Sequence, residues 1–357
     1  MTTETRKRTQ SGVPYVELPS PNNRHDEKRR QRQVLLVFVP GNPGLVHYYD
    51  TFLGTLRMLL DETETKMGGT GVAFTIYAQN LLGFEDGDDH GGVPFGGEGR
   101  GPYGLEEQIE GVYGRLAELN LVGGGRFYDE VVVMGHSVGA YIAVEVFHRH
   151  HHFLREGRSS EGGDDKEVSR VNLNLKAGIL LFPAVSHLAR SSNGRKLDVV
   201  RTTPLLDSHA HRVAKAFVDL WPRWLLGVVV RRVMGFTAAA AEVTVGFLRS
   251  RDGIWQALHL GKDELVTITE ERWSREIGGG DVAVVPDKFF FYFGEKDHWV
   301  ADECRDEFIA RRKEHSRGRV RIEIDREGIP HAFCIHHGEK VAEKVKVWVD
   351  EIVGSGV

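Results

Sequence analysis

Apolar and polar residues are arranged along most of the chain in blocks that predict strands and helices. Continuous apolar runs, typical of strands buried on both faces of a sheet, occur at residues 34–39, 74–78, 131–134, 175–183 and 288–293. Segments with the apolar spacing of helices occur at about 48–60, 105–119, 140–147 and 341–353. Residues 320–324 alternate between apolar and polar, which predicts a last strand. This order favours an α/β fold, with a mostly parallel central sheet flanked by helices.

The alternation stops between about residues 185 and 285, where the pattern is helical. The most apolar stretch of the chain, 221–247, lies in this interval and is interrupted by Arg223, Arg231 and Arg232. Two compatible interpretations stay open. The helices lie in a membrane interface with the arginines at the level of the headgroups, or they form a buried pair that covers the active site.

These changes of pattern divide the chain into three parts. Residues 1–33 are polar and basic, and we interpret them as a solvated or edge-strand lead-in, with contact to anionic lipid as the alternative. The α/β core is expected at 34–184 and 286–357, and a helical cap insertion at 185–285. Glycine-rich and charged segments at 85–104 and 155–170 are interpreted as surface loops.

The apolar run at 131–134 leads directly into Gly135-His136-Ser137-Val138-Gly139, and an apolar helix face follows. Strand, Gly-x-Ser-x-Gly turn and helix together are the context of a nucleophile elbow. In this turn the serine has a strained backbone, and the glycines leave room where a Cβ would clash. The alternative is an ordinary serine in a tight turn. The flanking strand and helix favour Ser137 as a nucleophile, and hence an α/β-hydrolase fold.

A nucleophilic serine needs a base that removes its proton and an acid that orients the base. In α/β-hydrolases these follow in the order Ser, Asp or Glu, His. Asp297 and His331 have this order and come just after predicted strands, whose carboxyl ends meet at one edge of the sheet. The competing acids are Asp302, expected in a helix, and Asp325, expected on the approach to His331. The competing histidines, His136 and His298, lie next to the predicted triad residues.

An oxyanion hole needs two backbone N–H groups close to the developing oxyanion. Val138, directly after the nucleophile, is expected to supply one. The other is expected from Asn42, in the loop after the strand at 34–39, where Gly41 permits a close approach. Pro40 and Pro43 have no N–H, which narrows the choice.

Composition restricts the class of protein. With 41% hydrophobic and 27% charged residues, the chain has the composition of a soluble globular protein. Its net charge of −5 gives no basic field, so we expect no nucleic-acid partner. The two cysteines, Cys304 and Cys334, are too few for a disulfide framework and indicate a reducing compartment. Neither a signal peptide nor a simple membrane-spanning run is evident.

Two clusters raise the question of metal binding. The acidic residues at 85–89 lack EF-hand spacing, so a solvated loop is preferred. His148, His150, His151 and His152 have no carboxylate or cysteine partner at ligand spacing, so we interpret them as cations near a helix C-terminus. We expect neither a metal ion nor a cofactor.

Several segments in fixed order resemble the lipid droplet-associated hydrolase family of the α/β-hydrolase superfamily. They are Val39-Pro40-Gly41-Asn42-Pro43-Gly44 with Tyr48-Tyr49, Gly135-His136-Ser137-Val138-Gly139-Ala140-Tyr141, Leu181-Phe182-Pro183 with Ser192-Asn193-Gly194, Asp263-Glu264-Leu265, Asp297-His298-Trp299-Val300 and Ile329-Pro330-His331-Ala332-Phe333-Cys334. The resemblance implies that Ser137, Asp297 and His331 match the family's triad. It also implies that the helical insertion takes part in droplet targeting.

The function implied by the resemblance is a serine esterase or lipase that cleaves carboxylic esters of neutral lipids, either sterol esters or acylglycerols. The expected location is the cytosolic face of lipid droplets and the endoplasmic reticulum, so the partners are the neutral lipid ester and that surface. Two alternatives stay open. One is an acyltransferase that uses the same triad, and the other is a droplet-surface binding or organising protein with little turnover. The oligomeric state stays open as well.

Overall fold

The computed structural model describes residues 7–9, 12–21, 31–66, 71–84, 101–122, 126–156, 165–270, 273, 288–315 and 318–354. Residues 85–100 of the predicted loop at 85–104, most of the lead-in at 1–33 and residues 157–164 therefore lie outside the described residues.

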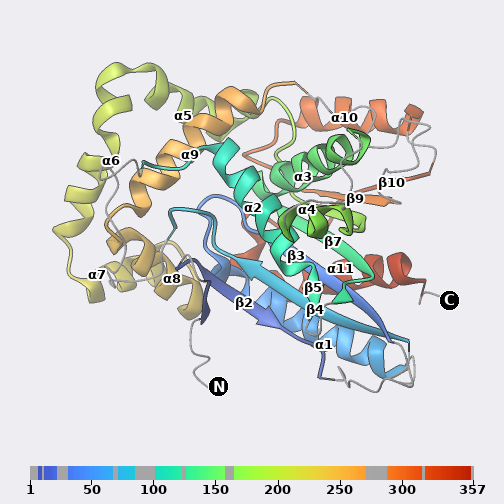
Figure 1. Cartoon of the computed structure of the whole chain (residues 1–357). Coiled ribbons are helices and arrows are strands. Elements are labelled where there is room, and N and C mark those ends of the chain that lie inside the picture. The colour runs from blue at the N-terminus through green and yellow to red at the C-terminus, as the bar shows by residue number, and fades with distance from the viewer. Residues whose placement is uncertain are drawn as a thin grey trace.

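An eight-stranded sheet forms the centre of the molecule, in the order β1-β2-β4-β3-β7-β8-β9-β10 (Figure 1). Its strands are β1 (Lys7–Arg8), β2 (Pro14–Leu18), β3 (Arg32–Val39), β4 (Val72–Gln79), β7 (Glu130–His136), β8 (Leu175–Leu181), β9 (Lys288–Phe293) and β10 (Val320–Ile324). The six neighbouring strands β4, β3, β7, β8, β9 and β10 are parallel, and β1 and β2 form an antiparallel edge. A separate two-stranded ladder pairs β5 (Leu121–Val122) with β6 (Arg126–Phe127).

Helices cover both faces of this sheet, so the central strands are buried on each side. Alternate residues of β3 enter two different clusters: Val34, Leu36 and Phe38 contribute to one, and the residues between them to the other. The first face is covered by α1 (Asp50–Lys66) and α11 (Gly338–Val353), and the second by α2 (Leu105–Leu119), α3 (Val138–Arg155) and α10 (Asp302–His315). The predicted fold class, an α/β-hydrolase fold, is confirmed. Its mostly parallel sheet is flanked by helices, and a helical insertion interrupts the alternation of strands and helices.

The insertion contains only helices in the part of 185–285 that the structure describes. They are η2 (Leu188–Arg190), α5 (Ser192–Thr202), α6 (Pro204–Asp219), α7 (Arg223–Val228), the π-helical η3 (Val229–Val233), α8 (Ala238–Arg249) and α9 (Gly253–Thr267). Figure 1 shows them gathered at one end of the molecule, with α6 and α7 farthest from the sheet. Among the described residues, no helix combines the length and apolar character needed to cross a bilayer.

One loop interpretation is wrong in part. Residues 165–171, expected in a surface loop at 155–170, form a short helix, α4 (Asp165–Val171). Ser169 in this helix is buried, and its carbonyl accepts a hydrogen bond from Asn120 Nδ2 at 3.1 Å. Tertiary contact with the end of α2 therefore stabilises a helix whose charged sequence gives no apolar periodicity.

The contact of α11 with the sheet supplies a stability test. Trp348 is completely buried, and its ring lies 5.3 Å from that of Phe290 on β9. We expect Trp348→Ala to lower the free energy of unfolding by about 3–5 kcal/mol, because it leaves a cavity in the core. The matched control is Val347→Ala, one residue earlier and 53% exposed, with an expected effect within about 0.5 kcal/mol. Urea unfolding of both variants measures this, and equal losses would contradict the packing described.

Candidate active site

The turn between β7 and α3 places Ser137 at the carboxyl edge of the sheet. Ser137 has φ 56° and ψ −121°, a conformation that L-residues rarely adopt. Its neighbouring glycines are required by contact: a Cβ on Gly135 would lie 2.2 Å from the carbonyl oxygen of Gly139. A Cβ on Gly139 would lie 2.2 Å from the carbonyl oxygen of Val39. The backbone crossing is therefore too close for any other residue at either position.

The structure brings Ser137, His331 and Asp297 into one chain of hydrogen bonds. His331 Nε2 lies 2.9 Å from Ser137 Oγ, and His331 Nδ1 lies 2.7 Å from Asp297 Oδ2. Because a carboxylate only accepts, Nδ1 carries the ring proton and Nε2 is left to accept the serine hydroxyl. The other oxygen of Asp297 accepts the N–H of Trp299 at 2.8 Å. The carboxylate is thus held at both oxygens, and its side chain is only 3% exposed.

The competing acids have other partners. Asp325 is buried, and its two oxygens accept the hydroxyl of Tyr292 and the N–H of Ile329, each at 2.7 Å. It therefore supports the loop that leads from β10 to His331. Asp302 is exposed at the start of α10, where it contacts Arg305 at 3.1 Å. Among the described residues, Asp297 is the acid in contact with His331.

The loop after β3 lies against the nucleophile. A Cβ on Gly41 would be 3.2 Å from the Cβ of Ser137, so Gly41 permits this approach. The N–H of Gly41 donates to the hydroxyl of Tyr49 at 3.1 Å, and it is therefore engaged elsewhere. Asn42 follows directly, and Val138 is the first residue of α3, where backbone N–H groups lack partners within the helix. The roles of Val138 and Asn42 in an oxyanion hole stay predictions.

Asn42 also joins this loop to the insertion. Its side-chain Nδ2 donates to the carbonyl of Ala257 at 3.0 Å and to Glu264 Oε1 at 3.1 Å, both on α9. Burial raises the pKa of Glu264 to about 8, the hydrogen bond from Asn42 opposes this, and the nearby Asp263 adds to it. Glu264 is therefore largely uncharged at neutral pH. Asp263-Glu264-Leu265 is one of the segments that carry the family resemblance, but the contact between Glu264 and Asn42 is visible only in the structure.

Further hydrogen bonds join the insertion to two other loops of the site, those of Tyr48 and His298. The hydroxyl of Tyr48 lies 2.8 Å from Thr244 Oγ1 on α8. On the acid side, the carbonyl of His298 accepts the N–H of Asn193 at 3.0 Å and the hydroxyl of Ser192 at 3.2 Å. The first turn of α5 thus holds the residue directly after Asp297.

His136 does not take the place of the base beside Ser137 Oγ, which His331 occupies. Its ring lies on the α1 and α11 side of the sheet, 2.6 Å from the hydroxyl of Tyr49 through Nδ1. Nε2 lies 2.9 Å from the backbone carbonyl of His331. Burial, followed by the proximity of His331, holds the pKa of His136 well below its usual range. Sequence reasoning set this histidine aside and gave no role to Tyr49.

Among the described residues, the histidines near the end of α3 do not gather with other potential ligands into a group of three that could hold a metal ion. Their interpretation as cations is wrong for His150. This side chain is buried beside Tyr113, and burial lowers its pKa to about 4. The run of four histidines could not show which of them face the core.

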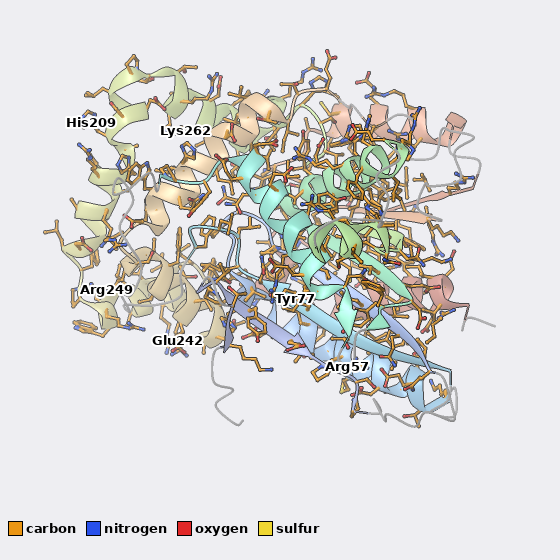
Figure 2. All side chains as sticks on the ribbon, in the orientation of Figure 1. Arg57, Tyr77, His209, Glu242, Arg249 and Lys262 are labelled. Carbon is orange, nitrogen blue, oxygen red and sulfur yellow. The ribbon has the colours of Figure 1, made fainter. Side chains whose placement is uncertain are left out.

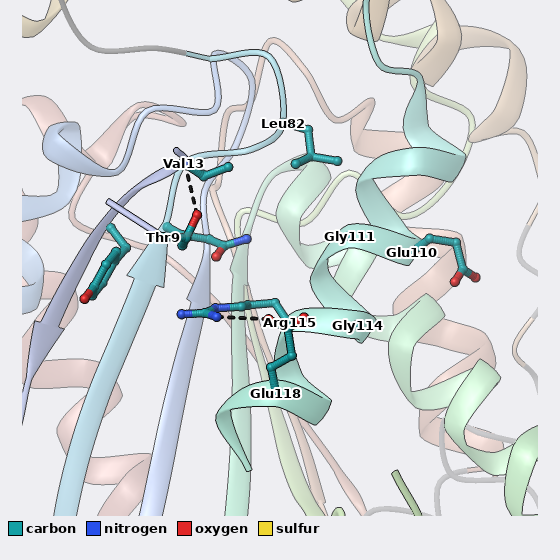
Figure 3. Close-up of a pocket in the computed structure, with 10 residues that line it drawn as sticks. Thr9, Val13, Leu82, Glu110, Gly111, Gly114, Arg115 and Glu118 are labelled. Atoms are coloured by element: carbon teal, nitrogen blue, oxygen red, sulfur yellow. Dashed lines mark hydrogen bonds and ion pairs between the residues drawn. The ribbon is translucent and has the colours of Figure 1, made fainter. Parts of the chain in front are cut away.

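A separate cavity of about 840 Å³ lies at the antiparallel edge of the sheet, between β2 and α2 (Figure 3). Its lining is Thr9, Val13, Tyr15, Gln79, Leu82, Glu110, Gly111, Gly114, Arg115 and Glu118. None of the predicted site residues contributes to it.

Comparison with known proteins agrees with this architecture. The peroxisomal alpha-beta-hydrolase Lpx1 of Saccharomyces cerevisiae is 13% identical, with a TM-score of 0.57, and the match covers 97% of this chain and 83% of that one. An epoxide hydrolase of Vigna radiata is 12% identical, with a TM-score of 0.50 and 95% of each chain covered. The fold and the elbow thus define an α/β-hydrolase.

The sequence comparisons narrow this class to a family. Residues 32–334 match the lipid-droplet associated hydrolase family. The lipid droplet-associated hydrolase of Gallus gallus is 24% identical over 333 residues, which cover 91% of this chain and 87% of the relative. That of Homo sapiens is 22% identical over 330 residues, with 90% and 86% covered. The chain belongs to the lipid droplet-associated hydrolase family.

The buried Glu264 predicts a dependence of stability on pH. Its pKa is raised in the folded protein, so the folded state binds its proton more tightly, and stability is lost as pH rises from about 4.5 to about 8. We expect Glu264→Gln, which removes the charge, to be more stable than the natural chain by roughly 2–5 kcal/mol at pH 8.5. At about pH 5 we expect little difference. Denaturant unfolding at both pH values measures this.

The control is Glu242→Gln on α8, whose side chain is exposed and labelled in Figure 2. Its difference from the natural chain is expected to be small and independent of pH. If Glu264→Gln gains no stability at pH 8.5, the buried carboxyl does not titrate as described.

Proposed function

We propose that this protein is a serine hydrolase that cleaves carboxylic esters of neutral lipids, either sterol esters or acylglycerols. The observation that carries the proposal is the unbroken hydrogen-bond chain from Ser137 Oγ through His331 to Asp297, built on a strained elbow. Strain of this kind is found where a function depends on it. Membership of a hydrolase family supports the class of reaction, and the names of the relatives support a lipid substrate.

The hydrogen-bond chain supports the following course of ester cleavage, in which the roles of Val138 and Asn42 are part of the proposal. His331 Nε2 accepts the proton of Ser137 Oγ as that oxygen attacks the ester carbonyl, and Asp297 stabilises the imidazolium. The N–H groups of Val138 and Asn42 bind the oxyanion. His331 then gives the proton to the departing alcohol, and the acyl group stays on Ser137. A water molecule, activated by His331, attacks this acyl-enzyme and releases the fatty acid.

An exposed apolar surface on the insertion supports a lipid partner. Of the fourteen exposed large apolar side chains in the described chain, ten lie between residues 199 and 234: Val199, Leu205, Leu206, Val213, Phe217, Leu220, Trp224, Val228, Val233 and Met234. We call this set the apolar face. The helix α6 has no buried residue, and its side chains Leu205, Val213 and Phe217 are 72%, 67% and 59% exposed.

Basic side chains accompany this face. Arg212, Arg223, Arg231 and Arg232 are exposed on the same helices. A surface that combines aromatic and aliphatic groups with arginines suits the boundary between headgroups and acyl chains. We infer that the apolar face rests on the phospholipid monolayer of a lipid droplet or on the cytosolic leaflet of the endoplasmic reticulum. The helix α8, by contrast, packs inward through Ala240, Ala241 and Val245.

The first test is fatty-acid release from emulsions of a sterol ester and of a triacylglycerol. We expect Ser137→Ala, His331→Ala and Asp297→Asn each to lower the rate by on the order of 10³-fold or more, because the three residues act as a unit. Transfer of the acyl group to added alcohol in place of release identifies an acyltransferase. Equal rates for Ser137→Ala and the natural chain on both esters would refute hydrolysis at this serine.

The second test addresses the apolar face by flotation with phospholipid-coated triacylglycerol droplets. We expect a variant with Leu220→Ser, Trp224→Ser and Val233→Ser to lose most of its binding, because these side chains are 80%, 70% and 78% exposed.

The matched control for this variant carries Met58→Ser, Val266→Ser and Val347→Ser. These side chains are 57%, 57% and 53% exposed, but they lie outside the apolar face. We expect this control to float as the natural chain does. If both variants bind equally well, the apolar face is not the contact with lipid.

A further inference from the structure

Two buried side chains beneath the site have no role in the mechanism above. Tyr49, in η1 (Val46–Tyr49), accepts the N–H of Gly41 at 3.1 Å and lies 2.6 Å from His136 Nδ1. His136 Nε2 lies 2.9 Å from the carbonyl oxygen of His331. A single chain of hydrogen bonds thus runs from the loop that carries Asn42 to the backbone of the predicted base.

The carbonyl oxygen of His331 can only accept, so His136 Nε2 carries the hydrogen of that bond. Burial disfavours a second proton on the ring and holds the pKa of His136 low, so Nδ1 is left to accept the hydroxyl of Tyr49. The tyrosine oxygen in turn accepts the Gly41 N–H. We therefore assign His136 as a neutral imidazole with its proton on Nε2.

The surroundings of His136 leave its ring little freedom. The rings of Phe333, Tyr49 and Phe182 lie 5.0, 5.7 and 6.3 Å from it, and all three are buried. A Cβ on Gly41 would lie 3.0 Å from His136 Nδ1, so the loop after β3 rests directly on the ring. His136, the residue before the nucleophile, thus contacts the loop of Gly41 and Asn42, which we call the oxyanion loop, on one side. On the other side it contacts the backbone of His331.

We propose that Tyr49 and His136 are positioning residues, which hold the oxyanion loop and His331 in register with Ser137. This role rests on the proposed function, because it presumes that Ser137 and His331 react. A displacement of about 1 Å in a reacting group lowers a rate by about 10²-fold. Loss of the bond to the His331 carbonyl is therefore expected to lower kcat and to leave KM nearly unchanged, since neither residue is placed against substrate.

Two substitutions of His136 by amide residues distinguish the loss of its hydrogen bond to the His331 carbonyl from the loss of the imidazole ring itself. In His136→Gln the amide nitrogen reaches the position of Nε2 and can donate to His331. In His136→Asn the amide reaches only the position of Nδ1. We expect kcat for p-nitrophenyl butyrate to fall about 10–100-fold in His136→Asn and less than about fivefold in His136→Gln. Tyr49→Phe is expected to lower kcat as well, and to add little to His136→Asn, because both break one chain.

Thermal unfolding of each variant accompanies the kinetics. A loss of kcat that follows the melting temperature instead of the donor at the Nε2 position would overturn the proposal. Equal kcat for the Asn and Gln variants in folded protein would overturn it as well. In both cases the proposed function stands, because the natural chain still hydrolyses the ester and Ser137→Ala does not.

A second measurement is independent of turnover. In the ¹⁵N spectrum of the histidine-labelled protein, we expect the His136 signals, assigned by their absence in His136→Gln, to show an Nε2–H tautomer from about pH 5 to 8. Among the described residues, the titratable groups that act on the ring or on its tyrosine partner are Tyr48, Tyr49, His331 and Cys334. Burial raises the pKa of Tyr49 well above its usual range and that of Cys334 to about 12. Protonation of His136 in this range, or an Nδ1–H tautomer, would refute the chain even if the enzyme were inactive.

Discussion

The backbone turn at Ser137 is the constraint on which the rest of the site depends. A residue with positive φ at the end of a buried strand is held only if its surroundings fix it, and here the surroundings are other backbone atoms. Gly139 lies against the carbonyl of Val39, so the turn also fixes where β3 ends. The loop with Gly41 and Asn42 is consequently placed beside the nucleophile, and the parallel order of β7, β8, β9 and β10 delivers Asp297 and His331 to the same edge.

The insertion has two sides with different physical character. Its inner side, formed by α8, α9 and the start of α5, makes polar contacts with the loops of Asn42, Tyr48 and His298. Its outer side, from α6 to η3, carries the apolar face. Between them, Lys262 on α9, labelled in Figure 2, bonds to Asp207 on α6 at 2.8 Å. The helices that contact the loops of Asn42, Tyr48 and His298 therefore adjoin the surface that we assign to lipid.

Much of this architecture is predictable because local pattern and tertiary fold agree. Apolar runs mark the central strands. The chain order of serine, acid and histidine, together with the rule that parallel strands end at one edge, predicts that Asp297 and His331 lie near Ser137. The failures concern residues whose state depends on distant neighbours. Whether His150 is a cation depends on burial beside Tyr113, and α4 depends on contact with α2. The sequence pattern does not distinguish, within 221–247, η3, where most residues are exposed, from α8, where five residues are buried. His136 is not expected to be the base, because side chains next to triad residues in a turn usually point elsewhere, and only the fold shows that its ring contacts Tyr49.

The central claim is that Ser137 is an activated nucleophile, and covalent labelling with a fluorophosphonate probe tests it most directly. The purified protein is incubated with the probe in the presence of detergent, digested, and mapped by mass spectrometry. The account predicts a single adduct on the peptide that contains Ser137, and its loss in Ser137→Ala with a matching circular dichroism spectrum. A folded protein that gains no adduct, or gains it at another serine, would contradict the claim and leave the elbow as a structural turn.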